Sequence, residues 1–205
     1  MLDRFEHWLG SVPVSAERPG FASLVIRAVE PSESPILEHD FRDGEADAAA
    51  VIALAREHLN ADCAYEVEAY WDLWHRHPDT GLWQRGPQRL LLICHGEAYD
   101  NGVAAESGHF LADLGLEHLY TGHAGLLGTR GARSAPADPV EAKFLALMAE
   151  EEPLREYHER TRQNIQQLMD WTGAVEQALP VERTVLWSEG EENLEARLDE
   201  ILAVH

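Results

Sequence analysis

The strongest constraint on the fold is a run of strict alternation over 64–74 (AYEVEAYWDLW). Its apolar positions are Tyr65, Val67, Ala69, Trp71 and Leu73. The positions between them are Glu66, Glu68, Tyr70, Asp72 and Trp74. Because successive side chains of a strand point to opposite faces, this period of two predicts a β-strand with one core face and one wet or functional face.

The chain is predicted to turn back after this strand as a hairpin. Residues 78–81 (PDTG) are typical of a turn, because proline presets φ and glycine tolerates positive φ. The returning run Leu90–Cys94 is apolar throughout, which predicts a central strand buried on both faces. Cys63 and Cys94 then become cross-strand neighbours, either as two small buried residues or as a redox pair.

Further elements follow from periodicity and end signals. Strands are predicted over 21–30, 36–41 and 181–187. Helices are predicted over 2–10, 43 to about 59, 104–114, 116–121, 139–150 and 153–179, with a last one after Ser188. Asp43 is the expected N-cap of the helix it begins, and Ser188 with Glu191 forms a capping box for the last helix.

This element order predicts an α+β protein with a mixed or antiparallel sheet of four to five strands and helices mainly on one face. Leaving out the short second strand gives β-α-β-β-α-β, the order of ferredoxin-like folds. We expect one domain over 1–205. An exposed linker at about 125–139 precedes a mostly helical segment, 139–205, which returns strand 181–187 to the sheet.

Charge and composition exclude several classes of function. Lys plus Arg is 16 and Asp plus Glu is 37, so the formal net charge is −21, and no basic patch for nucleic acid is visible. No apolar run approaches the roughly 20 residues of a membrane span, and the N-terminus lacks the features of a secretory signal, so we expect a cytoplasmic protein. Two cysteines exclude a disulfide scaffold and a cysteine-rich zinc site.

The polar face of the 64–74 strand is the first candidate binding surface. It consists of Glu66, Glu68, Tyr70, Asp72 and Trp74. Aromatic rings beside carboxylates suit a protein partner or a cationic ligand, although a covering helix or cross-strand contacts would also explain them. The apolar stripe of helix 153–179 packs on the chain's own sheet or forms an oligomer seam. The first hypothesis is therefore a non-catalytic binding or interaction protein that self-associates.

The stretch 95–123 supports an alternative, a metal-dependent hydrolase. Its candidate metal ligands are His95, Glu106 and His109, with His118 or His123 as a further ligand, because imidazole and carboxylate groups bind zinc, iron and manganese. A divalent metal would be the cofactor, and Glu97 or Asp100 the general base. Alternatively, these histidines cap helices, bond to the backbone or lie at the surface.

Overall fold

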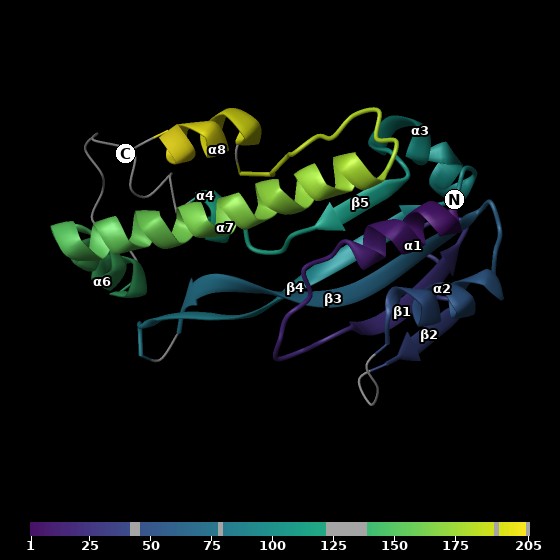
Figure 1. Ribbon diagram of the computed structural model, residues 1–205, viewed down its shortest axis with the longest axis horizontal. Coiled ribbons are helices and arrows are strands. Elements are labelled where there is room, and N and C mark those ends of the chain that lie inside the picture. Colours follow the sequence, from purple (N-terminus) through teal and green to yellow (C-terminus); the bar gives the residue numbers. More distant parts are fainter. Residues whose placement is uncertain (42–45, 78–79, 122–138, 191–192, 204–205) are drawn as a thin grey trace. The chain divides into compact units, whose positions relative to one another are not determined.

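The computed structural model describes residues 1–41, 46–77, 80–121, 139–190 and 193–203 (Figure 1). The chain divides into two compact units, and neither is continuous in sequence. The first unit comprises Met1–Leu73, Arg85–Gly115 and Trp171–Glu182, and the second comprises Trp74–Gln84, Leu116–Asp170 and Arg183–His205. A single domain over 1–205 stays a prediction. The linker expected at 125–139 lies outside the described residues, except for Pro139, which begins a helix.

One antiparallel sheet of five strands forms the framework, in the order β2-β1-β3-β4-β5. The strands are β1 (Phe21–Ala28), β2 (Leu37–Asp40), β3 (Cys63–Arg76), β4 (Trp83–His95) and β5 (Phe110–Asp113). The β3–β4 hairpin has the same register at both of its ends, because the N–H of His77 donates to the carbonyl of Leu82 and the N–H of Gly96 donates to that of Cys63. The predicted α+β class is confirmed, whereas this strand order does not confirm a ferredoxin-like arrangement.

The alternation predicted for the 64–74 stretch is confirmed by burial. All five apolar side chains of β3, from Tyr65 to Leu73, are 0% exposed. Trp71 meets Trp171 edge to face, with ring centroids 5.7 Å apart, and Trp8 stacks on Trp171 at 6.0 Å. Burying each such large side chain contributes about 1.5–3 kcal/mol, so this aromatic cluster is a main source of stability in the first unit.

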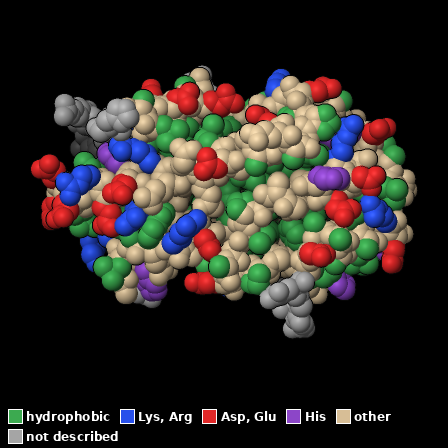
Figure 2. Space-filling view, viewed as in Figure 1, with side chains coloured by type: hydrophobic (Ala, Val, Ile, Leu, Met, Phe, Trp, Pro, Cys, Tyr) green, Lys and Arg blue, Asp and Glu red, His purple; other side chains and the backbone are tan. Residues whose placement is uncertain are grey.

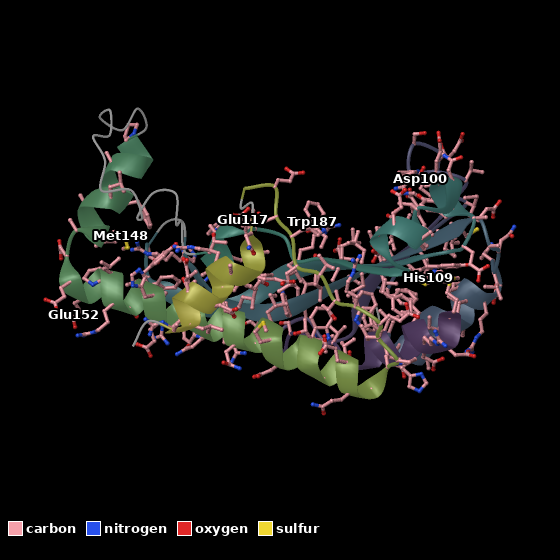
Figure 3. The ribbon with its side chains drawn as sticks, turned by 90° about the horizontal axis from the view of Figure 1, so that it is seen from above. Asp100, His109, Glu117, Met148, Glu152 and Trp187 are labelled. Atoms are coloured by element: carbon pink, nitrogen blue, oxygen red, sulfur yellow. The ribbon has the colours of Figure 1, made fainter. Side chains whose placement is uncertain are left out.

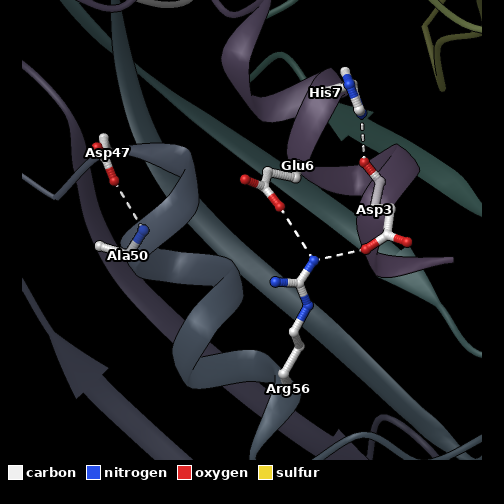
Figure 4. A network of polar contacts seen from close by, with 6 residues as sticks. All are labelled: Asp3, Glu6, His7, Asp47, Ala50 and Arg56. Carbon is white, nitrogen blue, oxygen red and sulfur yellow. Dashed lines mark hydrogen bonds and ion pairs between the residues drawn. The ribbon is translucent and has the colours of Figure 1, made fainter.

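Helices α1 (Leu2–Gly10) and α2 (Ala48–Arg56) lie on the same face of the sheet (Figure 1). The residue that caps α2 is Asp47, whose carboxylate accepts a hydrogen bond from the N–H of Ala50 at 2.8 Å (Figure 4). The expected cap, Asp43, lies outside the described residues. Arg56 of α2 reaches the carboxylates of Asp3 and Glu6 on α1 at 2.6 and 3.3 Å, which joins the two helices at the surface.

Two of the predicted elements are wrong. Residues 181–187 are irregular and belong to no strand of the sheet. The helix expected over 104–114 is limited to α3 (Ala104–Ser107), because Gly108 takes a φ of 87° and Phe110–Asp113 pairs with β4 as β5. A short 3₁₀ helix, η1 (Tyr99–Gly102), precedes α3. Tertiary pairing thus overrides local helix preference at this point.

Helices dominate the second unit, namely α4 (His118–Thr121), α6 (Pro139–Met148), α8 (Leu194–Ala203) and most of α7 (Glu151–Ala178). The predicted stripe of α7 is buried at Tyr157, Thr161, Ile165 and Leu168, so the chain itself covers this stripe. Asn164 holds Trp74 by accepting from its N–H at 2.8 Å and donating to its carbonyl at 2.9 Å. None of the described helices is both long and apolar enough to cross a membrane.

Charged side chains of both signs are spread over the face drawn in the space-filling view. Figure 2 shows acidic and basic groups interspersed on this face rather than gathered into one patch of a single sign. This distribution matches the sequence, in which acidic residues occur throughout the chain. Net charge alone therefore singles out no part of this face as a binding surface.

Candidate functional site

The part-exposed face of the sheet carries carboxylates in two rows that cross three strands. In the first row, Val25 of β1 pairs with Glu38 of β2 on one side and Glu66 of β3 on the other. In the second row, Ser23 pairs with Asp40 and Glu68 in the same way. Directly paired residues of an antiparallel sheet project from the same face. We call this surface the acidic face, defined by Ser23, Val25, Glu38, Asp40, Glu66 and Glu68.

Two arginines organise the central carboxylates of the acidic face. Nε of Arg27 lies 3.1 Å from Oε1 of Glu66, and Nε of Arg89 lies 2.8 Å from Oε2 of Glu68. The hydroxyl of Tyr70 donates to the other oxygen of Glu68 at 2.8 Å. The Glu66 and Glu68 side chains remain 21% and 23% exposed. Both carboxylates are thus held in fixed orientations while still in contact with water.

The predicted binding residues do not all lie in the same unit. Tyr70 stacks under the guanidinium of Arg18, whose Cζ lies 4.5 Å from the ring centroid, and Asp72 accepts from the N–H of Ala16 at 3.1 Å. Trp74 belongs to the second unit, where the Arg160 guanidinium lies 3.9 Å from its ring centroid. The first unit therefore holds every predicted binding residue except Trp74.

Aliphatic side chains continue the same face across β4 and β5. Leu90, Leu92 and Cys94 are 0% exposed, but Leu91 and Ile93 between them are only half-buried. The prediction that this run is buried on both faces is thus wrong. On the β5 side, Ile93 pairs with Leu111 and Leu91 pairs with Asp113. On the β3 side, the register of the hairpin puts these two aliphatic residues opposite Glu66 and Glu68, so the apolar part of the face adjoins its charged part. Such a mixture of charge and aliphatic surface is typical of protein-binding faces.

His95 and Tyr99 form a buried corner at the end of the sheet. The His95 side chain is 9% exposed and its ring stacks on Tyr99, with centroids 5.5 Å apart and planes 13° apart. Desolvation lowers the pKa of His95, and a backbone hydrogen bond to Gly108 and the nearby carboxylates of Asp100 and Glu66 oppose that shift. Burial also raises the pKa of Tyr99. At neutral pH the side chains of His95 and Tyr99 are therefore both uncharged.

Strained backbone holds this corner in place. Val29, Asp100 and Asn101 have φ values of 69°, 45° and 55°, in the left-handed region that a β-branched residue such as valine rarely adopts. The N–H of Asp100 donates to the carbonyl of Val29 at 2.7 Å, which ties η1 to the chain just after β1. A Cβ on Gly96 would lie 2.3 Å from the carbonyl oxygen of Ala61, so only glycine fits there.

The structure does not assemble the predicted metal ligands. Within the described ranges, no group of three or more His, Cys, Asp or Glu side chains is placed to hold a metal ion. His95 and His109 meet through backbone, since the N–H of His95 donates to the carbonyl of His109 at 2.8 Å and Nδ1 of His109 donates to that of His95 at 3.1 Å. His109 and Glu106 are exposed. Asp100 and His109 lie at the same end of the first unit (Figure 3).

The remaining members of the predicted metal and catalytic set lie elsewhere. His118 belongs to the second unit, where burial lowers its pKa, and His123 lies outside the described residues. The two expected general bases are an exposed Glu97 and a half-buried Asp100. Cys94 is fully buried, and desolvation raises the pKa of its thiol to about 12, so it stays protonated at neutral pH.

Sequence patterns did not identify the two arginines that pair with glutamates of the acidic face. Arg27 and Arg89 come from different strands, and only the register of the sheet brings each beside its glutamate. No protein-family model matches the chain, and searches of curated proteins and of solved structures also gave no match.

Proposed function

We propose that the chain is a non-catalytic binding protein that holds a basic protein segment on its acidic face. The observation that carries this proposal is the pair of carboxylate rows, Glu38 with Glu66 and Asp40 with Glu68, on three neighbouring strands. Charge complementarity of this kind steers a partner to its site and fixes its register. Arg27 and Arg89 pair with the two inner groups of these rows, Glu66 and Glu68.

The edge strand β2 supplies the most accessible part of this surface. Glu38 and Asp40 are both exposed, whereas Glu66 and Glu68 are half-buried. A basic side chain can therefore reach the outer carboxylates first and then displace or share the inner ion pairs. The half-buried Val25, Leu91 and Ile93 add apolar contact area beside the charges.

Binding rather than catalysis is supported by the state of two reactive side chains at the end of β4, Cys94 and His95. The Cys94 thiol is buried and its pKa is raised to about 12. The His95 imidazole is enclosed between Tyr99 and the backbone near Gly108. Neither group has the exposure and activation that nucleophilic or acid–base catalysis requires.

An NMR titration of the ¹⁵N-labelled full chain tests where a basic segment binds. The probe is a decapeptide of alternating lysine and valine, and the matched control peptide has glutamate in place of lysine. We expect the basic peptide to shift the amide signals of Ser23, Val25, Glu66 and Glu68, and the acidic peptide to shift none of them. Shifts spread evenly over the exposed carboxylates of both units would contradict the proposal, because they would show attraction by net charge alone.

A further inference from the structure

The segment 183–189 (RTVLWSE), which we call the strap, is complementary to itself in the reverse direction. Leu186 stands at its centre. Val185 and Trp187 flank the centre, Thr184 and Ser188 come next, and Arg183 and Glu189 are the outermost residues. Two straps aligned antiparallel about Leu186 would therefore place each Arg183 opposite a Glu189 and each Val185 opposite a Trp187.

The strap behaves as a strand that the sheet leaves unpaired. Its β-branched and aromatic residues are those that favour strands, yet it belongs to no strand of the sheet. Exposure alternates along it, because Val185, Trp187 and Glu189 are exposed while Leu186 and Ser188 are half-buried. The side chains of Val185, Trp187 and Glu189 thus point to solvent, whereas those of Leu186 and Ser188 are partly covered by the rest of the second unit.

Two carboxylates of the second unit fix the strap on both sides of Trp187. The N–H of Leu186 donates to Oε1 of Glu195 at 3.3 Å, and the hydroxyl of Ser188 donates to the carboxylate of Glu117. The Glu117 carboxylate also packs against Gly190, where an added Cβ would lie 2.7 Å from Oε2. Figure 3 shows Glu117 and Trp187 on neighbouring segments of this unit. The backbone around Trp187 is therefore ordered before any partner binds.

The strap nevertheless leaves a large apolar surface in water. Trp187 is 65% exposed and Val185 is 54% exposed, and Leu116, beside the strap's anchor Glu117, is 60% exposed. Within the part of the chain that the structure describes, the backbone N–H groups of Val185 and Trp187 make no hydrogen bond. In an extended chain, consecutive N–H groups point to opposite edges, so in an extended strap these two would point away from the edge that Leu186 turns toward Glu195.

We propose that the occupant of this surface is a second copy of the chain, whose strap pairs antiparallel with the first about Leu186. Val185 and Trp187 would form the hydrogen-bonded pairs, because their N–H groups lie on the outer edge. Leu186 would face its counterpart as a non-hydrogen-bonded pair and keep its bond to Glu195. Two Arg183–Glu189 ion pairs would close the ends of this two-fold symmetric contact. The contact uses no residue of the acidic face, so it is independent of the proposed function.

Symmetry favours a second copy over an unrelated partner. An isologous contact needs a surface that complements itself, which the order Arg183, Val185, Leu186, Trp187, Glu189 provides. Two short strands bury less than the roughly 1,600 Å² of a standard interface, so the dimer should be weak, with a Kd of roughly 10–100 µM. The formal charge of −21 on each copy also opposes association.

Sedimentation equilibrium of the full chain tests this pairing through a charge swap. The single variants Arg183→Glu and Glu189→Arg each place like charges opposite one another, so each should weaken dimerisation by about tenfold or more. The double variant R183E/E189R recreates both ion pairs in reverse and should return the Kd to within about threefold of the wild-type value. The control is Arg155→Glu on α7, where the side chain is 72% exposed and lies outside the strap.

Restored dimerisation of the double variant R183E/E189R is the decisive result. Because Arg183 and Glu189 are both exposed, none of these variants should disturb the fold. A wild-type chain that stays monomeric up to about 1 mM would overturn the proposal, since that is well above the expected Kd. A dimer that both single variants leave unchanged, or that the double variant fails to restore, would overturn it as well.

Discussion

Arg27 and Glu66 lie on neighbouring strands, and Nε of Arg27 is 3.1 Å from Oε1 of Glu66 on the part-exposed face of the sheet. Their side chains are 25% and 21% exposed. An ion pair this accessible contributes little to stability, about 0.2–1 kcal/mol. Its more important effect is to orient a carboxylate that would otherwise rotate freely in water, and the predictions for the acidic face depend on that orientation.

Removing this pair should change binding more than stability. We expect Glu66→Gln to lower the free energy of unfolding by less than about 1 kcal/mol, because water replaces the lost partner. The same variant should weaken binding of the lysine–valine peptide by about threefold to tenfold, since one fixed carboxylate is lost. Urea denaturation and peptide titration of the same preparation measure both quantities. A loss of several kcal/mol with unchanged binding would assign Glu66 a structural role instead.

Two tryptophans of the chain should differ sharply in their contribution to stability. Trp71 is 0% exposed, so Trp71→Ala should destabilise the fold by about 3–5 kcal/mol by opening a cavity. Trp187 is 65% exposed, so Trp187→Ala should change the free energy of unfolding by less than about 0.5 kcal/mol. Urea unfolding of dilute, monomeric protein compares the two variants. Equal losses in the free energy of unfolding would contradict the difference in burial between Trp71 and Trp187.

Acid should destabilise the first unit through His95. Burial lowers its pKa below the ordinary value of 6.5, so folding favours the neutral imidazole. The resulting stability is fully present above pH 6.5 and is lost as the pH falls from 6.5 to the lower pKa of the folded state. His95→Phe keeps a ring beside Tyr99 and removes this titration. The stability of the variant should therefore fall less steeply over that range in urea unfolding at a series of pH values. An unchanged slope would contradict the enclosure of His95.

Salt should act in opposite directions on the two proposed interactions. Raising the salt concentration from about 50 to about 300 mM screens the attraction between carboxylates and lysines, so peptide binding on the acidic face should weaken. The same change screens repulsion between two chains of charge −21, so dimerisation should strengthen. Peptide titrations and sedimentation equilibrium at matched salt concentrations measure the direction of the salt effect on peptide binding and on dimerisation. A dimer that weakens with salt would show that its ion pairs outweigh the net repulsion.

The elements predicted correctly from sequence are those with long, unambiguous periodicity. The alternation around Trp71 and the helical spacing from Tyr157 to Leu168 each repeat several times, so tertiary context did not override them. The segment around Val185 has equal strand propensity, but no neighbouring strand accepts it. At 104–114 the helical pattern continues past Gly108, whose positive φ ends the helix before β5. A propensity scale contains no information on which segments pair.

The candidate site was predicted only in part, for a related reason. The alternation of β3 correctly placed Glu66 and Glu68 on a wet face. Their partners Arg27 and Arg89 come from β1 and β4, and the carboxylates of Glu38 and Asp40 come from β2, so their proximity depends on register across four strands. The histidines of 95–123 share a short stretch of sequence, but His95 and His109 meet only through hydrogen bonds to each other's backbone, and His118 belongs to the second unit.

The affinity of charge-reversed variants for the lysine–valine peptide tests the central claim most directly. Glu38→Lys and Asp40→Lys, combined in one chain, reverse two exposed charges of the acidic face. The matched control combines Glu57→Lys and Glu106→Lys, which change the net charge equally at two exposed positions outside the acidic face. We predict that the first double reversal weakens binding by about a hundredfold at low salt, and that the control weakens it by less than about threefold. Equal losses in the two chains would contradict a binding surface on the acidic face.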